Sequence, residues 1–269
     1  MTPGISRSDT LGRLLALGRP AVMGILNVTP DSFSDGGQFL DANVAIDHAR
    51  RMAAEGADIL DIGAESTRPY GGAKPVSPED ELARLKPVLG EVVRLGLPVS
   101  IDTIKAKVAA WALERSAAIM NDVWGLQRDP DMARVAAEHG VPVIVMHNRD
   151  VVDASLDIMA DAQAFFARSL DIAAQAGIAR DRIVLDPGIG FGKTPEQSIA
   201  MIARLGELRA LGQPLLMGLS RKRFIDSVSP SKPDQRIGGS IAGNVMAVLG
   251  GADTLIRFRW RHAVDEALA

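Results

Sequence analysis

Residues 23–37 read Met-Gly-Ile-Leu-Asn-Val-Thr-Pro-Asp-Ser-Phe-Ser-Asp-Gly-Gly, an apolar strand that ends at Asn27 and passes into a loop of small polar residues. A strand that serves only as core usually leads into a short turn. This strand instead delivers a polar amide and then a loop that could fold over a ligand. An ordinary Pro/Asp/Gly connection explains the loop equally well. The other strand ends of the chain therefore decide between the two interpretations.

Short apolar runs alternate with longer amphipathic stretches along the whole chain. The predicted strands are 21–27, 57–63, 98–102, 118–123, 141–147, 182–186, 214–219 and 254–258. The predicted helices are 42–55, 78–95, 105–116, 130–139, 155–176, 195–211 and 238–250. Helical crossovers between consecutive strands imply parallel pairing. The strand count and the Val/Ile/Leu-rich runs favour an α/β fold of the (β/α)8 TIM-barrel type over a doubly wound sheet.

Composition agrees with one barrel domain. The chain has 269 residues, of which 47% are hydrophobic and only 4% aromatic, so the core is mostly aliphatic. Packed parallel strands require such a core, and a barrel of this type has about 250 residues. Because no low-complexity linker separates two halves, we expect an N-terminal extension over residues 1–20 and a single domain over residues 21–269.

Charge and residue usage exclude several kinds of function. The net charge is −3, with acidic and basic residues interspersed, which gives no footprint for nucleic acid. The absence of cysteine excludes disulfides, thiolate nucleophiles and thiolate metal sites. No apolar run is long enough for a signal sequence or a membrane span, so we expect a cytoplasmic protein.

The segment 187–194 resembles a phosphate loop, but Pro187 stands where its first glycine belongs.

Every predicted strand delivers a polar or charged side chain at its carboxyl end, and in a barrel these ends converge on one mouth. In chain order they are Asn27, Glu65-Ser66-Thr67-Arg68, Asp102, Asn121-Asp122, His147, Asp186, Ser220-Arg221-Lys222, and Arg257 with Arg259. A buried unpaired polar group costs roughly 1–3 kcal/mol, so a purely structural barrel would have few of them. Each residue alone still has a structural explanation, such as a helix cap for Asp102 or a turn at Asp122. His147 fits a ligand contact and a supporting role equally well.

Two groups of these residues suit different parts of a ligand. The first could read a flat heterocycle with donors and acceptors along one edge, because a carboxylate matches paired N–H groups; it consists of Asp102, Asn121, Asp186 and Lys222. The second suits an anion, and pyrophosphate with Mg²⁺ would be natural; it consists of Asn27, Arg68, Arg257 and Arg259.

The ordered series of motifs resembles the dihydropteroate synthases of the pterin-binding barrel family over about residues 21–258. It consists of residues 24–37, Glu65-Ser66-Thr67-Arg68-Pro69, Ser100-Ile101-Asp102-Thr103, Asn121-Asp122-Val123, Met146-His147, residues 185–193 and Ser220-Arg221-Lys222. The resemblance implies a transferase of folate biosynthesis. Such an enzyme joins 6-hydroxymethyl-7,8-dihydropterin pyrophosphate to p-aminobenzoate, giving 7,8-dihydropteroate and pyrophosphate.

The resemblance also implies a role for each matching residue. Asp102, Asn121, Asp186 and Lys222 would hold the pterin edge, and Met146 and Phe191 would line its pocket. Arg257 would stack on the ring and touch the diphosphate, Asn27 would ligate Mg²⁺, and Arg68 would contact pyrophosphate. Phe33, Thr67, Pro69 and Ser220 would shape the p-aminobenzoate site. The resemblance further implies a homodimer and competition by sulfonamides, which mimic p-aminobenzoate.

A site rich in electrostatic clamps and poor in general bases suits this chemistry. An arylamine is already neutral and nucleophilic at pH 7, so the difficult event is departure of pyrophosphate. The pterin ring can delocalise the cation left behind, and Mg²⁺ with arginines can stabilise the leaving group. We therefore expect an ionisation-first substitution with Asn27, Asp102, Lys222 and Arg257 as its main participants.

One residue departs from the family pattern. After the last strand the family usually has Arg-x-His, whereas this chain has Arg257-Phe258-Arg259. Arginine still binds phosphate, but the change leaves open a pterin-binding paralogue with reduced turnover. A methyltetrahydrofolate-dependent methyltransferase of the same barrel family is a second alternative. It has no need of the Ser66-Thr67-Arg68-Pro69 loop.

Overall fold

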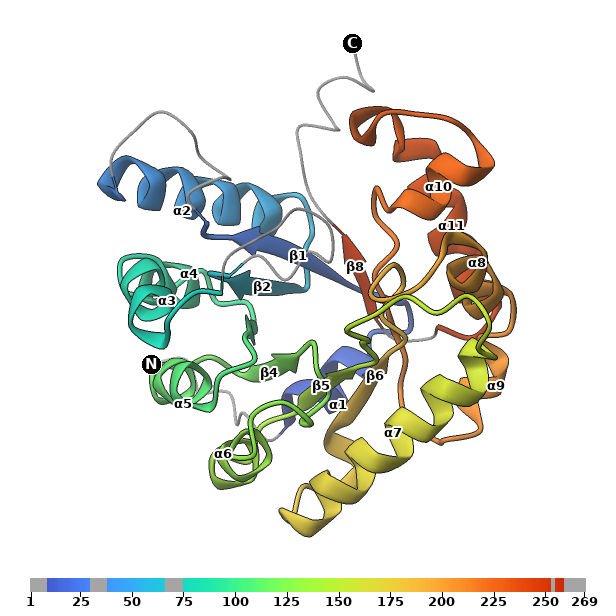
Figure 1. Ribbon diagram of the computed structural model, residues 1–269. Coiled ribbons are helices and arrows are strands. Elements are labelled where there is room, and N and C mark those ends of the chain that lie inside the picture. The colour runs from blue at the N-terminus through green and yellow to red at the C-terminus, as the bar shows by residue number, and fades with distance from the viewer. Residues whose placement is uncertain (1–8, 30–37, 66–74, 253–254, 259–269) are drawn as a thin grey trace.

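Eight parallel strands form one curled sheet in the order β6-β5-β4-β3-β2-β1-β8-β7, and helices surround it (Figure 1). The strands are β1 (Ala21–Asn27), β2 (Ile59–Gly63), β3 (Val99–Asp102), β4 (Ile119–Asp122), β5 (Val143–Met146), β6 (Ile183–Asp186), β7 (Leu216–Met217) and β8 (Leu255–Phe258). This computed structural model describes residues 9–29, 38–65, 75–252 and 255–258, with the backbone alone over 38–41 and 255–258. The eight predicted strands are confirmed, most of them a residue or two shorter than predicted.

The strands at the two ends of this order also touch. Leu185 of β6 forms a single parallel bridge with Leu215, which directly precedes β7. The amide of Leu185 donates to the carbonyl of Pro214 at 2.9 Å. The sheet therefore curls far enough to bring its first and last strands into contact.

Helices follow most strands, as predicted, with differences at proline and in short segments. The longer helices are α2 (Gln38–Ala54), α3 (Pro78–Leu85), α5 (Ala106–Glu114), α6 (Met132–His139), α7 (Ile158–Gln175), α8 (Pro195–Ala203) and α11 (Ile237–Leu249). The shorter ones are α1 (Thr10–Leu15), α4 (Leu89–Val93), α9 (Gly206–Arg209) and α10 (Arg223–Val228). The predicted helix 78–95 is divided into α3 and α4 around Pro87, which lacks the N–H that a continuous helix needs. Helix 195–211 is likewise divided into α8 and α9.

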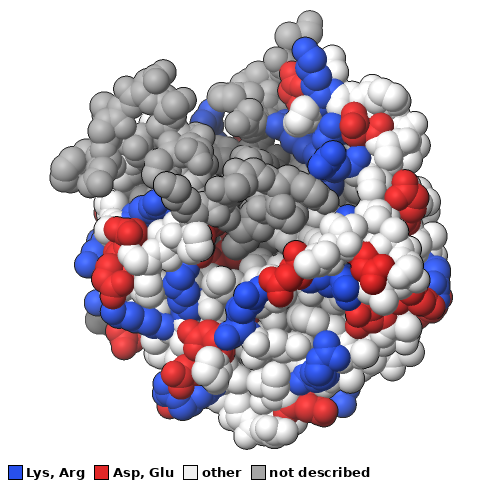
Figure 2. Space-filling view, in the orientation of Figure 1, with Lys and Arg blue, Asp and Glu red and all other residues white. Residues whose placement is uncertain are grey.

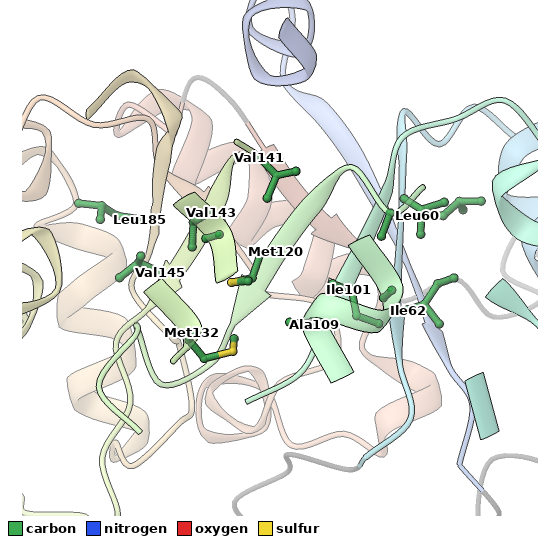
Figure 3. Packing of buried hydrophobic residues seen from close by; sticks show 14 of the residues in the cluster. Leu60, Ile62, Ile101, Ala109, Met120, Met132, Val141, Val143, Val145 and Leu185 are labelled. Carbon is green, nitrogen blue, oxygen red and sulfur yellow. The ribbon is translucent and has the colours of Figure 1, made fainter. Parts of the chain in front are cut away.

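Side chains alternate between two faces of the sheet, which separates two apolar clusters. Leu60, Ile62, Ile101, Met120 and Leu185 face outward and pack against the helices (Figure 3). The second cluster lies on the opposite face and joins residues near the strand beginnings to α1. Its members are Leu11, Leu14, Ala21, Met23, Ile59, Ala118, Ile119, Ile144, Val184 and Leu216. Apolar packing thus fills the amino ends of the strands and leaves the carboxyl ends for polar residues.

In the part of the chain that the structure describes, no helix is long and apolar enough to cross a membrane.

Candidate active site

The predicted polar residues at the carboxyl ends of β1, β3 and β4 lie at one level of the sheet. Strand register places Asn27 opposite Gly63, Gly63 opposite Asp102, and Asp102 opposite Asn121. Further along the sheet, Met146 of β5 lies opposite Asp186 of β6. Because side chains alternate along a strand, these residues lie on the same face of the sheet as the second apolar cluster, the inner cluster that contains Met23 and Ile119. Of the predicted heterocycle-binding group, the register makes Asp102 and Asn121 direct neighbours and places Asp186 on the same face of the sheet.

Asn121 is held by a carboxylate that the sequence analysis did not select. Its side-chain Nδ2 donates to Oδ1 and Oδ2 of Asp61 at 3.1 and 3.3 Å, and both residues are buried. The amide oxygen of Asn121 is buried without a hydrogen-bond partner among the described residues. A buried acceptor of this kind suits an N–H group of a ligand.

Asp102 does not cap the helix that follows it. The amide of Ala106, the first residue of α5, is instead capped by Oδ2 of Asp129 at 2.8 Å. Asp102 itself is buried at the end of β3, beside Asn121. The helix-cap explanation is therefore removed for this carboxylate, which strengthens the case for a ligand contact.

The loop after β6 folds tightly around Asp186. Oδ1 of Asp186 accepts from the amide of Gly188 at 2.7 Å. Gly188 has a φ of 63°, and a side chain there would come within 2.0 Å of the carbonyl oxygen of His147. Only glycine fits this close approach. The loop therefore fixes the orientation of the Asp186 carboxylate.

Lys193 lies inside the same loop and is buried. Its Nζ donates to the carbonyls of His147, Gly188 and Phe191 at 3.2, 2.8 and 2.9 Å. Burial and the nearby charge of Lys222 lower the pKa of Lys193 well below 10.5. This lysine therefore cross-links the loop through three backbone carbonyls.

Lys222 approaches the loop from the other side. Its Nζ donates to the carbonyl of Ile189 and lies 4.7 Å from the ring centroid of Phe191. The preceding Arg221 has a φ of 58°, and its amide donates to Oγ of Ser240 at 2.9 Å. This turn directs Lys222 toward the β6 loop. Lys222 and Phe191, which the resemblance assigns to the same pterin pocket, therefore lie next to each other.

Basic side chains gather around α10, which Lys222 precedes (Figure 2). Arg221 and Arg223 flank Lys222 in the sequence, and the buried Arg236 donates to the carbonyl of Arg221 at 3.3 Å. Ser220 precedes this run, and its Oγ is buried without a hydrogen-bond partner in the described part of the chain. An electropositive edge of this kind suits an anionic ligand.

Two residues from the list of strand ends point toward the helices instead. Nε2 of His147 lies 3.0 Å from Oδ2 of Asp161 on α7, and its ring meets Phe165 edge-on at 5.0 Å. Burial and the charge of Lys193 lower the pKa of His147 to about 3. His147 is thus a neutral support residue, which resolves the two roles that the sequence left open.

Asp122 also faces away from the mouth. Its carboxylate accepts from the amides of Trp124 and Leu126 at 2.8 and 2.7 Å. Burial raises the pKa of Asp122 to about 6. The turn explanation therefore holds for this residue.

Glu65 is the last described residue before residue 75, and its carboxylate makes contacts with two different segments. Its Oε1 accepts from the amide of Val76 at 3.0 Å. Its other oxygen accepts from Lys105, which also donates to the buried Glu81 at 2.7 Å. The acidic residue of the strand end is thus a structural anchor.

Several predicted site residues cannot be placed. Phe33, Thr67, Arg68, Pro69 and Arg259 lie outside the described residues. The backbone of Arg257 lies in β8 opposite Met23, and the structure does not describe its side chain. Their roles remain predictions.

Asn27 is the predicted metal ligand, and its surroundings offer no preformed cage. Among the described residues there is no group of three His, Cys, Asp or Glu side chains that could hold a metal ion. Asn27 is half-buried at the end of β1 and offers one amide oxygen. This donor set fits Mg²⁺, which typically takes few protein ligands and completes its shell with substrate phosphates and water.

Sequence reasoning missed Asp61 and the cross-linking role of Lys193. For Asp61 a signal existed, because it is a carboxylate flanked by apolar residues inside the predicted strand 57–63. It also lies two residues before the strand end and so shares the face of Gly63.

Comparison with known proteins gives matches over nearly the whole chain. Residues 23–257 match the family of pterin binding enzymes. A dihydropteroate synthase of Clostridium beijerinckii is 45% identical over 89% of this chain and 88% of the relative. The crystal structure of dihydropteroate synthase from Clostridium difficile, determined with pteroic acid, has a TM-score of 0.86 and 46% identity, covering 93% of each chain. That of Xanthomonas albilineans with 4-aminobenzoic acid has a TM-score of 0.87 and 42% identity, covering 97% of this chain and 94% of the other.

Proposed function

The chain belongs to the family of pterin binding enzymes, and on that premise we propose how its residues carry out the reaction of its dihydropteroate synthase relatives. The chain is a transferase of folate biosynthesis that joins 6-hydroxymethyl-7,8-dihydropterin pyrophosphate to p-aminobenzoate, with release of pyrophosphate. The observation that supports the assignment of residues is the position of Asp102, Asn121 and Asp186, each of which is the last or next-to-last residue of its strand, on one face of the sheet.

The scaffold of this site is a closed (β/α)8 barrel formed by residues 21–269, with residues 1–20 as an extension. The bridge between Leu185 and Leu215 supports closure, because it joins the two ends of the strand order. The inner apolar cluster supports it too, since residues from nearly every strand meet there. The active site then lies at the carboxyl-end mouth of the barrel.

The pterin edge is read by complementary polar groups. Asn121 offers a buried acceptor through its amide oxygen, and the carboxylates of Asp102 and Asp186 accept from ring N–H and amino groups. Lys222 donates to a ring acceptor and lies against Phe191, which packs on the heterocycle together with Met146. Binding of this kind is selective, because an analogue that lacks one N–H leaves a buried carboxylate unpaired.

The chemical step is departure of pyrophosphate followed by attack of the neutral arylamine. The residues that favour it hold the leaving anion, and they are Arg68, Arg257 and Arg259. Asn27 would hold Mg²⁺ through its amide oxygen, and the bound ion would supply stabilisation of the negative charge on the leaving group. Phe33, Thr67, Pro69 and Ser220 surround p-aminobenzoate and keep water from capturing the pterin cation.

Release of pyrophosphate with and without p-aminobenzoate tests this assignment. We expect release that depends on p-aminobenzoate and on Mg²⁺, and inhibition by a sulfonamide that competes with p-aminobenzoate. Tight pterin binding without such release would instead indicate the paralogue with reduced turnover.

A homodimer through α11 belongs to the same proposal. This helix exposes a series of large apolar side chains, namely Ile241, Val245, Met246 and Leu249, the last of them 82% exposed. A contiguous exposed apolar surface favours association. Val245→Glu should convert a dimer to a monomer in sedimentation velocity, whereas Val151→Glu, at a still more exposed site away from α11, should leave the dimer intact. A cytoplasmic location also remains part of this proposal.

A further inference from the structure

A carboxylate lies inside the sheet below the proposed pterin site. Asp61 is fully buried, two residues before the end of β2, and its register neighbour on β3 is Ser100. Asn121 reaches it from β4 across β3, with Nδ2 at 3.1 and 3.3 Å from the two carboxylate oxygens. Burial of a carboxylate is costly. A position that contributes only packing would be filled by an apolar residue, as at Leu60 and Ile62.

The contact with Asp61 determines which end of the Asn121 amide faces the mouth. A carboxylate accepts hydrogen bonds, so the amide meets it with its NH₂ group. The amide oxygen must then point the other way. It is buried and has no hydrogen-bond partner among the described residues. Asn121 therefore presents an acceptor beside Asp102, its register neighbour.

We propose that Asp61 is a positioning residue that fixes the amide of Asn121, so that a hydrogen-bond acceptor faces the pterin edge. The inference rests on the proposed function, in which Asn121 binds that edge. It makes Asp61 a determinant of ligand choice. A heterocycle with an N–H or amino group at this place is accepted, and one with a ring carbonyl or an unprotonated ring nitrogen there is rejected.

Exchange of the two side chains tests the proposal most directly. Asp61→Asn removes the fixed orientation, because an amide at position 61 can donate or accept. We expect 6-hydroxymethylpterin to bind about ten- to a hundredfold more weakly, as loss of a charge-assisted contact predicts. Asn121→Asp should weaken binding at least as much, because two carboxylates then face each other.

The double variant Asp61→Asn/Asn121→Asp restores the arrangement. The amide at position 61 donates to the carboxylate at position 121, and that carboxylate still offers an acceptor to the ligand. We expect its dissociation constant, measured by titration calorimetry, within about threefold of wild type, as for a strongly coupled pair. In steady-state assays of Asp61→Asn, KM for the pterin substrate should rise while KM for p-aminobenzoate is unchanged.

Ser100→Ala is the matched control, because it alters a buried polar residue at the same level without touching the Asp61–Asn121 contact. Its pterin affinity should equal that of wild type. The proposal is overturned if Asp61→Asn binds as tightly as wild type, or if the folded double variant binds no better than Asn121→Asp. If Asp61→Asn alone does not fold, the comparison of Asn121→Asp with the double variant decides. Failure of the proposed function is distinguishable, because wild type itself would then not bind 6-hydroxymethylpterin.

Discussion

Replacing Lys193 by methionine tests whether a buried ammonium group holds the loop that shapes the pterin site. Nζ of Lys193 donates to the carbonyls of His147, Gly188 and Phe191. The carbonyl of Gly188 keeps a second donor in Lys193→Met, because it also accepts from the amide of Phe191 at 3.0 Å. The other two carbonyls lose the donor that the described structure provides. Methionine has a similar length, so the loss of hydrogen bonds dominates over the loss of packing.

The expected magnitude follows from these two carbonyls. A buried polar group left without a partner costs roughly 1–3 kcal/mol, so the pair costs about 2–6 kcal/mol. Removal of the buried cation offsets part of this, because burial already disfavours the charged form of Lys193. We expect the free energy of unfolding to fall by about 2–4 kcal/mol. Pterin affinity should fall too, because the loop carries Phe191 and the carbonyl that Lys222 contacts.

Urea unfolding with linear extrapolation measures the free energy of unfolding, and titration calorimetry measures the affinity for the pterin. Lys107→Met is the matched control, since Lys107 pairs with Glu79 on the surface with 62% of its side chain exposed. Its unfolding free energy should change by less than about 0.5 kcal/mol. A Lys193→Met protein as stable as wild type would refute the reasoning, because it would mean that the carbonyls find other donors at no cost.

Three further predictions follow from other contacts. The pKa of His147 is lowered to about 3 by burial and by the charge of Lys193, so between pH 6.5 and 5 only the unfolded chain takes up a proton at this residue. Over this range the unfolding free energy of wild type should fall by about 1.6 kcal/mol relative to His147→Gln. Equal pH dependence of the two proteins in urea unfolding would contradict this. Lys105→Met leaves the carboxylates of Glu65 and the fully buried Glu81 without their common cation. The unfolding free energy should fall by about 3–5 kcal/mol. Thermal stability equal to wild type would show that the two carboxylates are solvated. Asp102→Asn should weaken binding of 6-hydroxymethylpterin by roughly a hundredfold or more, and near-normal affinity in calorimetry would remove Asp102 from the site.

The fold could be predicted because its strands are marked by apolar runs with defined ends. The prediction of β1 over residues 21–27 coincides with the strand in the structure. Helix 78–95 was predicted as continuous, which is wrong, although Pro87 in its middle signals the interruption. The short α1 and α10 escaped prediction because six-residue helices depend on tertiary packing rather than on a periodic pattern. Local rules thus identified elements that are long enough to carry a pattern.

The candidate site could be predicted less completely, because position at a strand end does not determine direction. Asn27, Asp102, Asn121 and Asp186 share one face of the sheet, whereas Asp122 and His147 have the opposite parity or lie one residue further on. The alternation of side chains along a strand separates the two sets. Applying it requires knowing which residues of neighbouring strands are paired, and a single strand's sequence does not contain that information. The supporting role of His147 became visible only with its partner Asp161 on α7.

Residues that contact a ligand are easier to predict from sequence than the buried residues that orient them. Asp61 and Lys193 show why. Sequence rules treat charge as a mark of the surface, yet both residues are buried charges that bind other parts of the protein. Each holds a group that faces the proposed ligand: Asp61 orients the Asn121 amide, and Lys193 secures the loop that begins after Asp186. A site oriented in this way binds without ordering its polar groups at the moment of contact, which lowers the entropic cost of binding. The cost appears instead as buried charge, so a substitution at Asp61 or Lys193 should reduce affinity although neither residue touches the ligand.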